Sequence, residues 1–85
     1  MMPDTFEYKG VVYDTTHHSC DTYHGGPFDR GSADSYYHRS SAPHYYPEGT
    51  GKGDCVTSKD MTQAEIDAYF AGYEYNEIFG DKKVW

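Results

Sequence analysis

The chain has 85 residues, enough for one domain and no more. It contains no leucine, and Val, Ile and Phe together supply only 10 residues, so any core must rely on the 10 tyrosines and the other aromatic rings. The formal net charge of −7 disfavours direct nucleic-acid binding, which requires a basic patch. An acidic chain can bind a basic surface, or its charges can simply keep it solvated.

The first predicted element is a β-hairpin over Phe6–Asp14. Apolar and polar residues alternate on both sides of Lys9-Gly10, a dipeptide suited to a tight turn. The following segment, Thr15–Gly26, is polar and rich in histidine, and we interpret it as a loop.

That loop carries the strongest candidate metal ligands. Imidazole and thiolate groups suit zinc, although the spacing matches no standard zinc finger, and a polar loop with histidines is the alternative interpretation. Residues His38, His44 and Cys55 could complete such a site only if the fold brought them close. The candidate ligands within the loop are His17, His18, Cys20 and His24.

A helix is predicted from about Phe28 to Arg39, because Pro27 and an acid suit a first turn and Ala42-Pro43 ends the pattern. Ala33, Tyr36 and Tyr37 fall on one side of it. On another side Asp34 and His38 lie one turn apart, as an acid–base pair or a surface hydrogen bond would.

The segment from Pro43 to Lys59 is predicted to be mostly loop, with a short strand at Cys55–Thr57. Its glycine-rich part, Gly49–Gly53, lacks the pattern of a phosphate-binding loop. No signature of a nucleophilic enzyme surrounds Cys20 or Cys55, so we predict no catalytic residues.

The second predicted helix spans Gln63–Phe79. Thr62 and Glu65 fit a capping box, and Gly80 suits the position after the helix. An aromatic stripe follows at helical spacing, and we expect Tyr69 and Phe70 to lie in the core. Two apolar residues lie off this stripe, so the helix must be covered on two sides or await a partner. The stripe is Ile66, Tyr69, Phe70 and Tyr73, and the residues off it are Tyr75 and Ile78.

These elements predict a small α+β domain over residues 1–85, with an N-terminal β-hairpin, two α-helices and long ordered loops. The alternative is a pair of helices with the N-terminal segment draped over them. We expect no signal peptide and no membrane span, and therefore a cytoplasmic protein whose cysteines are free thiols.

One candidate contact surface combines arginine and tyrosine, both common at interface hot spots. In the alternative interpretation the arginines pair with Asp29 and Asp34, and the tyrosines belong to the core. The predicted partner-binding residues are Arg30, Tyr36, Tyr37 and Arg39 around the first helix, together with Tyr75 and Trp85.

About half of the chain resembles small proteins of tailed bacteriophages and prophages. Residues 27–46 carry their R-G-x-A-D-x-Y-Y-x-R…P-H core, and Met61–Tyr73 matches their M-T-x-x-E-I-x-x-Y-x-x-G-Y helix. The resemblance implies a phage origin, hence the cytoplasm of a host cell, and no particular mechanism. A fainter similarity is to ribosome modulation factor, through Arg30-Gly31, Arg39-Ser40 and Pro43.

Together these features predict a non-enzymatic, phage-type accessory protein that binds a host protein and inhibits or redirects it, without a cofactor. The alternatives are a ribosome- or RNA-associated regulator, which the fainter similarity implies, a small zinc-binding module, and a virion component.

Overall fold

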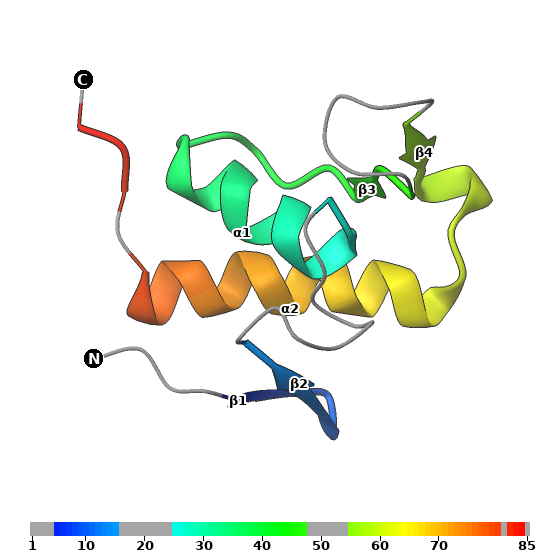
Figure 1. The fold of residues 1–85 in the computed structure, drawn as a ribbon, viewed down its shortest axis with the longest axis horizontal. Coiled ribbons are helices and arrows are strands. Elements are labelled where there is room, and N and C mark those ends of the chain that lie inside the picture. Colours follow the sequence, from blue (N-terminus) through cyan, green and yellow to red (C-terminus); the bar gives the residue numbers. More distant parts are fainter. Residues whose placement is uncertain (1–4, 16–24, 48–54, 81, 85) are drawn as a thin grey trace.

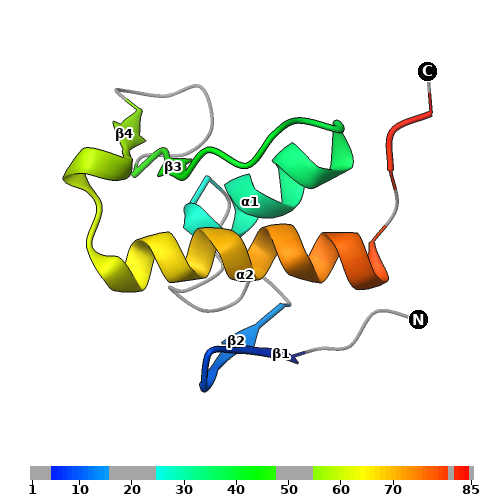
Figure 2. The ribbon, with the colours of Figure 1, turned by 180° about the vertical axis from the view of Figure 1, so that it is seen from behind.

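A computed structural model describes residues 5–15, 25–47, 55–80 and 82–84. Figure 1 shows helix α2 running through the middle of the molecule, with α1 along one side and the β1–β2 hairpin on the other, and Figure 2 shows the same arrangement from behind. The fold is α+β, as predicted. The elements are β1 (Thr5–Tyr8), β2 (Val11–Asp14), α1 (Pro27–Tyr36), β3 (His44–Tyr45), β4 (Val56–Thr57), a 3-10 turn (Ser58–Asp60) and α2 (Gln63–Phe79).

The predicted N-terminal hairpin is confirmed. Strands β1 and β2 pair antiparallel, with Phe6 opposite Tyr13, around a two-residue turn at Lys9-Gly10. Both turn residues have positive φ, 51° and 80°, as a turn that matches the twist of a hairpin requires. Because side chains alternate across a strand, Phe6, Tyr8 and Tyr13 all face α2.

Helix α2 begins and ends where the sequence predicts. The Thr62 hydroxyl accepts a hydrogen bond from the Glu65 amide at 3.2 Å, and the Glu65 carboxylate accepts one from the Thr62 amide at 2.8 Å. The second bond favours the ionised carboxylate and holds the pKa of Glu65 below its ordinary value. This capping box satisfies two of the amides that a helix start leaves without partners.

The core lies between α2 and the hairpin and consists mostly of rings. Phe28 of α1 is 1% exposed, and its ring centroid lies 5.5 Å from that of Tyr13 and 5.7 Å from that of Tyr75. The Tyr75 ring also meets Phe6 at 5.4 Å. The side of α2 that carries Tyr75 is therefore covered by the hairpin and by Phe28, while Ile78 stays 57% exposed.

Helices α1 and α2 cross with their backbones in contact, at Gly31 and Gly72. A methyl group added to Gly31 would overlap the carbonyl oxygen of Tyr69 and lie 2.9 Å from the Tyr73 nitrogen. A methyl group on Gly72 would overlap the carbonyl oxygen of Phe28. Only glycine allows this approach, in which α-hydrogens can point at backbone oxygens across the helix interface.

Helix α1 ends at Tyr36, three residues before the predicted end at Arg39. The His38 amide donates to the Ser35 carbonyl at 3.1 Å, and the Arg39 amide donates to the Asp34 carbonyl at 2.8 Å. These two bonds form a Schellman motif, with His38 at φ 60° in the position that glycine usually takes. Arg39 therefore lies beyond the helix.

The structure corrects three other expectations, one about secondary structure and two about burial. The predicted loop at Pro43–Lys59 contains strand β3, which pairs with β4 so that His44 lies opposite Thr57. Tyr69 is completely buried, as predicted, but Phe70 is only partly buried. The buried side of α1 is not the one that carries Ala33, Tyr36 and Tyr37; it is formed by Pro27, Phe28, Gly31, Asp34 and Ser35.

Neither α1 nor α2 is long and apolar enough to cross a lipid bilayer.

We expect Gly72→Ala to destabilise the domain, although alanine normally favours a helix by about 1 kcal/mol. The added methyl group must push α1 away from α2, and such overpacking typically costs about 1–3 kcal/mol. Urea unfolding of both proteins measures the change. The control is Glu74→Ala, an exposed position in the same helix, which should leave the free energy of unfolding nearly unchanged. A Gly72→Ala protein as stable as the parent would contradict the backbone contact.

Candidate protein interface at the end of helix α1

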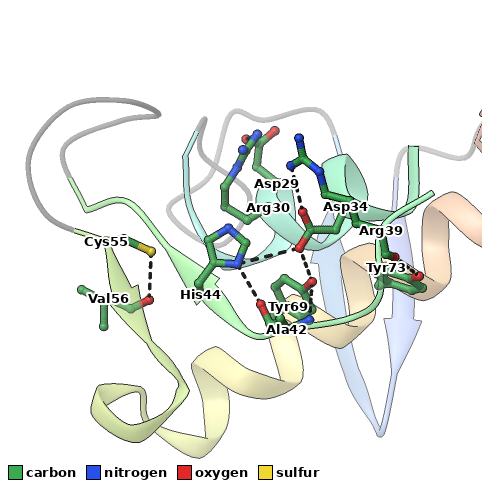
Figure 3. Close-up of polar contacts among 10 residues, drawn as sticks. All are labelled: Asp29, Arg30, Asp34, Arg39, Ala42, His44, Cys55, Val56, Tyr69 and Tyr73. Carbon is green, nitrogen blue, oxygen red and sulfur yellow. Dashed lines mark hydrogen bonds and ion pairs between the residues drawn. The ribbon is translucent and has the colours of Figure 1, made fainter. Parts of the chain in front are cut away.

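A buried carboxylate lies at the centre of the site. Asp34 is 3% exposed and accepts a short hydrogen bond from the Tyr69 hydroxyl of α2. Its other neighbours are Arg39 Nη1 at 3.4 Å and His44 Nδ1 at 3.8 Å. Figure 3 shows these side chains converging on Asp34: Tyr69 from α2, His44 from β3, and Arg39 from the segment that follows α1. A buried charge requires such partners, so Asp34 ties three parts of the chain together.

Tyr69 serves as donor and acceptor at once. While its hydroxyl donates to Asp34, its oxygen accepts the Ala42 amide at 2.9 Å. Burial, followed by the bond to Asp34, raises the pKa of Tyr69 well above its ordinary value, because the ionised ring would lose solvation and would face a carboxylate. The hydroxyl therefore keeps its proton and fixes residues 39–44 against α2.

Next to this buried link, Tyr37 and Arg39 form an exposed stack. The Arg39 guanidinium lies 5.0 Å from the centre of the Tyr37 ring, and its side chain is 60% exposed. Tyr37 is 41% exposed and meets the Tyr36 ring edge-to-face at 4.9 Å. The Tyr73 hydroxyl donates to the Arg39 carbonyl at 2.6 Å. The backbone that presents the stack is thus held at several points.

Arg30 has a different environment from Arg39. Its side chain is 15% exposed, pairs with Asp29 at 3.3 Å and lies 6.0 Å from the centre of the Tyr46 ring. Its Nε is, within the part of the chain that the structure describes, a buried nitrogen without a hydrogen-bond partner. Arg30 therefore braces the start of α1 and offers little surface to another molecule.

The structure brings together three of the six predicted partner-binding residues, namely Tyr36, Tyr37 and Arg39. The expectation for Tyr75 is wrong, because its ring is 5% exposed and belongs to the core. Trp85 lies outside the described residues. Both arginines also form the ion pairs of the alternative interpretation, with Asp29 and Asp34. Tyr37, however, is a surface residue and not part of the core.

The predicted pairing of Asp34 with His38 is wrong. His38 lies beyond the end of the helix, and its Nε2 lies 2.9 Å from the carbonyl oxygen of Lys83. His44 takes the place near Asp34 instead. Neither His44 nor Lys82, which contacts the end of α1, carried a sequence signal for these roles, because neither contact joins residues at the spacing of a helix or a hairpin turn.

The zinc hypothesis stays a prediction. Its four loop candidates, His17, His18, Cys20 and His24, lie outside the described residues, as does the segment Gly49–Gly53. Within residues 5–15, 25–47, 55–80 and 82–84, no three His, Cys, Asp or Glu side chains gather as metal ligands would. Cys55 is an exposed free thiol.

Comparison with models of protein families, with curated proteins and with solved structures finds no match to this chain. Function must therefore be inferred from the arrangement of its own side chains.

We expect Tyr69→Phe to destabilise the domain by about 1–3 kcal/mol or more, because a buried carboxylate and a backbone amide would each lose the hydroxyl that they bond. Urea unfolding at neutral pH measures this loss. The matched control is Tyr37→Phe, which removes an exposed hydroxyl and should change little. Equal stability of the two variants would contradict a structural role for the Tyr69 hydroxyl.

The raised pKa of Tyr69 predicts that the stabilisation by its hydroxyl depends on pH. In the unfolded chain Tyr69 ionises near its ordinary pKa of 10.0, whereas in the native domain the raised pKa keeps it protonated. Its contribution to stability is therefore complete below about pH 10 and declines as the pH rises further. The difference in unfolding free energy between the parent and Tyr69→Phe should begin to shrink near pH 10 and should continue to shrink as the pH rises toward the higher pKa of the native domain. A constant difference would contradict the raised pKa.

Proposed function

We propose that this domain acts by binding rather than by catalysis, and that it contacts another protein through the surface formed by Tyr36, Tyr37 and Arg39. The observation that carries the proposal is the exposed stack of an arginine on a tyrosine. The backbone carbonyl of that arginine is held by a hydrogen bond from Tyr73. Tyrosine and arginine dominate interface hot spots. Here they are preorganised, so little side-chain freedom would be lost on binding.

The guanidinium of Arg39 has capacity for a further partner. Its one hydrogen bond within the described chain is the long bond of 3.4 Å from Nη1 to Asp34. The planar guanidinium can therefore pair with a carboxylate on the partner while it stays stacked on Tyr37.

The partner that we propose is a host protein, which the domain would inhibit or redirect in the host cytoplasm. Support comes from the resemblance of residues 27–46 and 61–73 to small phage proteins, and from the size of the domain. A chain of 85 residues with a net charge of −7 is suited to occupying a surface of a larger protein, especially one with basic groups.

Affinity capture from a bacterial lysate tests the proposal when wild-type protein is compared with Arg39→Ala and Tyr37→Ala. We expect a host protein retained by the wild type to be lost from both variants, which corresponds to a weakening of about 1–2 kcal/mol or more. Lys59→Ala, at an exposed lysine of the 3-10 turn, is the control and should retain the partner. Circular dichroism verifies that all variants are folded.

Undiminished capture by the folded Tyr37 and Arg39 variants would refute this surface. Retention of ribosomal proteins that are released by high salt would support the ribosome-associated alternative in its place.

A further inference from the structure

The C-terminal turn of α1 holds a lysine ammonium. Lys82 Nζ lies 3.1 Å from the Ser35 carbonyl oxygen and 2.9 Å from Ser35 Oγ, and it also contacts the Glu77 carboxylate of α2. The Ser35 carbonyl, which also accepts the His38 amide, lies at the negative end of the dipole of α1. The end of α1 and Glu77 thus surround the ammonium with acceptors.

A second pair of contacts binds the backbone that carries this lysine. The Lys83 amide donates to the Tyr36 carbonyl at 2.7 Å, and the Lys83 carbonyl oxygen lies 2.9 Å from Nε2 of His38. The backbone of His38 has the left-handed conformation, with φ at 60°. One acceptor and one ring nitrogen therefore face the backbone of Lys83, as in the recognition of a peptide main chain.

The acceptors that surround Lys82 are also bonded to the rest of the helix pair. Ser35 is fully buried, its hydroxyl donates to Glu77 at 2.5 Å, and it accepts a hydrogen bond from Asn76 Nδ2 at 3.1 Å. These contacts join α1 to α2 directly. The site is therefore part of the rigid helix pair and not of the tail that fills it.

The described residues of the tail contact the helix pair through polar groups. Among the described tail residues, Lys83 and Val84 are exposed, Val84 to 88%, and Lys82 is only half-buried. None of these three described residues belongs to the apolar cluster of the core.

We propose that the end of α1, with Glu77, is a binding site for an extended, lysine-bearing segment of the partner protein, and that the chain's own Lys82-Lys83 fills it as an internal competitor. This inference rests on the proposed function, because the Tyr36 carbonyl joins the site to the surface of Tyr36, Tyr37 and Arg39. The net charge of −7 favours a basic partner over a second, equally acidic copy of the chain.

The test uses the chain of 85 residues and a synthetic peptide that copies residues 80–85, Gly-Asp-Lys-Lys-Val-Trp. Lys82→Ala frees the site, and amide signals of Ser35, Tyr36, His38 and Glu77 report peptide binding by NMR. We expect saturable, salt-sensitive binding to Lys82→Ala and about tenfold weaker binding to the wild type, where the tail occupies the site for most of the time. Lys59→Ala is the control and should behave as the wild type.

Specificity is tested with a peptide that has norleucine in place of its first lysine, and with the double variant Lys82→Ala, Glu77→Gln. Both changes should abolish binding, because they remove the ammonium or its carboxylate. Absence of saturable binding, equal binding by the norleucine peptide, or equal affinity of wild type and Lys82→Ala would each overturn the proposal. Concentration-dependent dimers of the wild type that disappear in Lys82→Ala would assign the site to the tail of a second copy instead.

The peptide measurement needs no partner protein, so it fails or succeeds separately from the capture experiment. Peptide binding without a captured host protein would retain the lysine site and refute the proposed function. Capture that depends on Arg39, without peptide binding, would support the proposed function and refute the lysine site.

Discussion

The close crossing of α1 and α2 is the constraint on which the rest of the molecule depends. With no leucine in the chain, side chains that interdigitate across a wide helix interface are scarce, and the two backbones instead meet at Gly31 and Gly72. This approach brings the polar residues Asp34 and Ser35 of α1 within reach of Tyr69 and the end of α2. Aromatic rings then fill the space between α2 and the hairpin.

The same crossing accounts for a surface at the end of α1. The bond from Tyr69 to Asp34 fixes the helix, the Schellman motif ends it, and Tyr73 holds the carbonyl of Arg39. A non-glycine residue in the left-handed position is costly by roughly 1–2 kcal/mol. His38 occupies that position and contacts the tail with its ring, so local strain and the proposed binding site coincide.

The sequence predicts what local signals determine and misses what the crossing determines. The capping box at Thr62 and the turn at Lys9-Gly10 are local, and both elements have the predicted bounds or register. A glycine inside each predicted helix, Gly31 and Gly72, is the available signal for close packing. Apolar periodicity cannot find the buried side of α1, because much of that side consists of glycine, aspartate and serine. It also cannot place Tyr75 in the core, since the hairpin that covers this ring is remote in sequence.

The most direct measurement is of nuclear Overhauser effects across the helix pair in isotopically labelled protein. We predict strong cross-peaks from the α-hydrogens of Gly31 to the Tyr73 amide and from those of Gly72 to the α-hydrogen of Phe28, since these backbones are in contact. Their absence in the folded protein, with cross-peaks only between side chains, would show that the helices are separated by a layer of side chains. The close crossing could then explain neither the buried Asp34 link nor the two proposed binding surfaces.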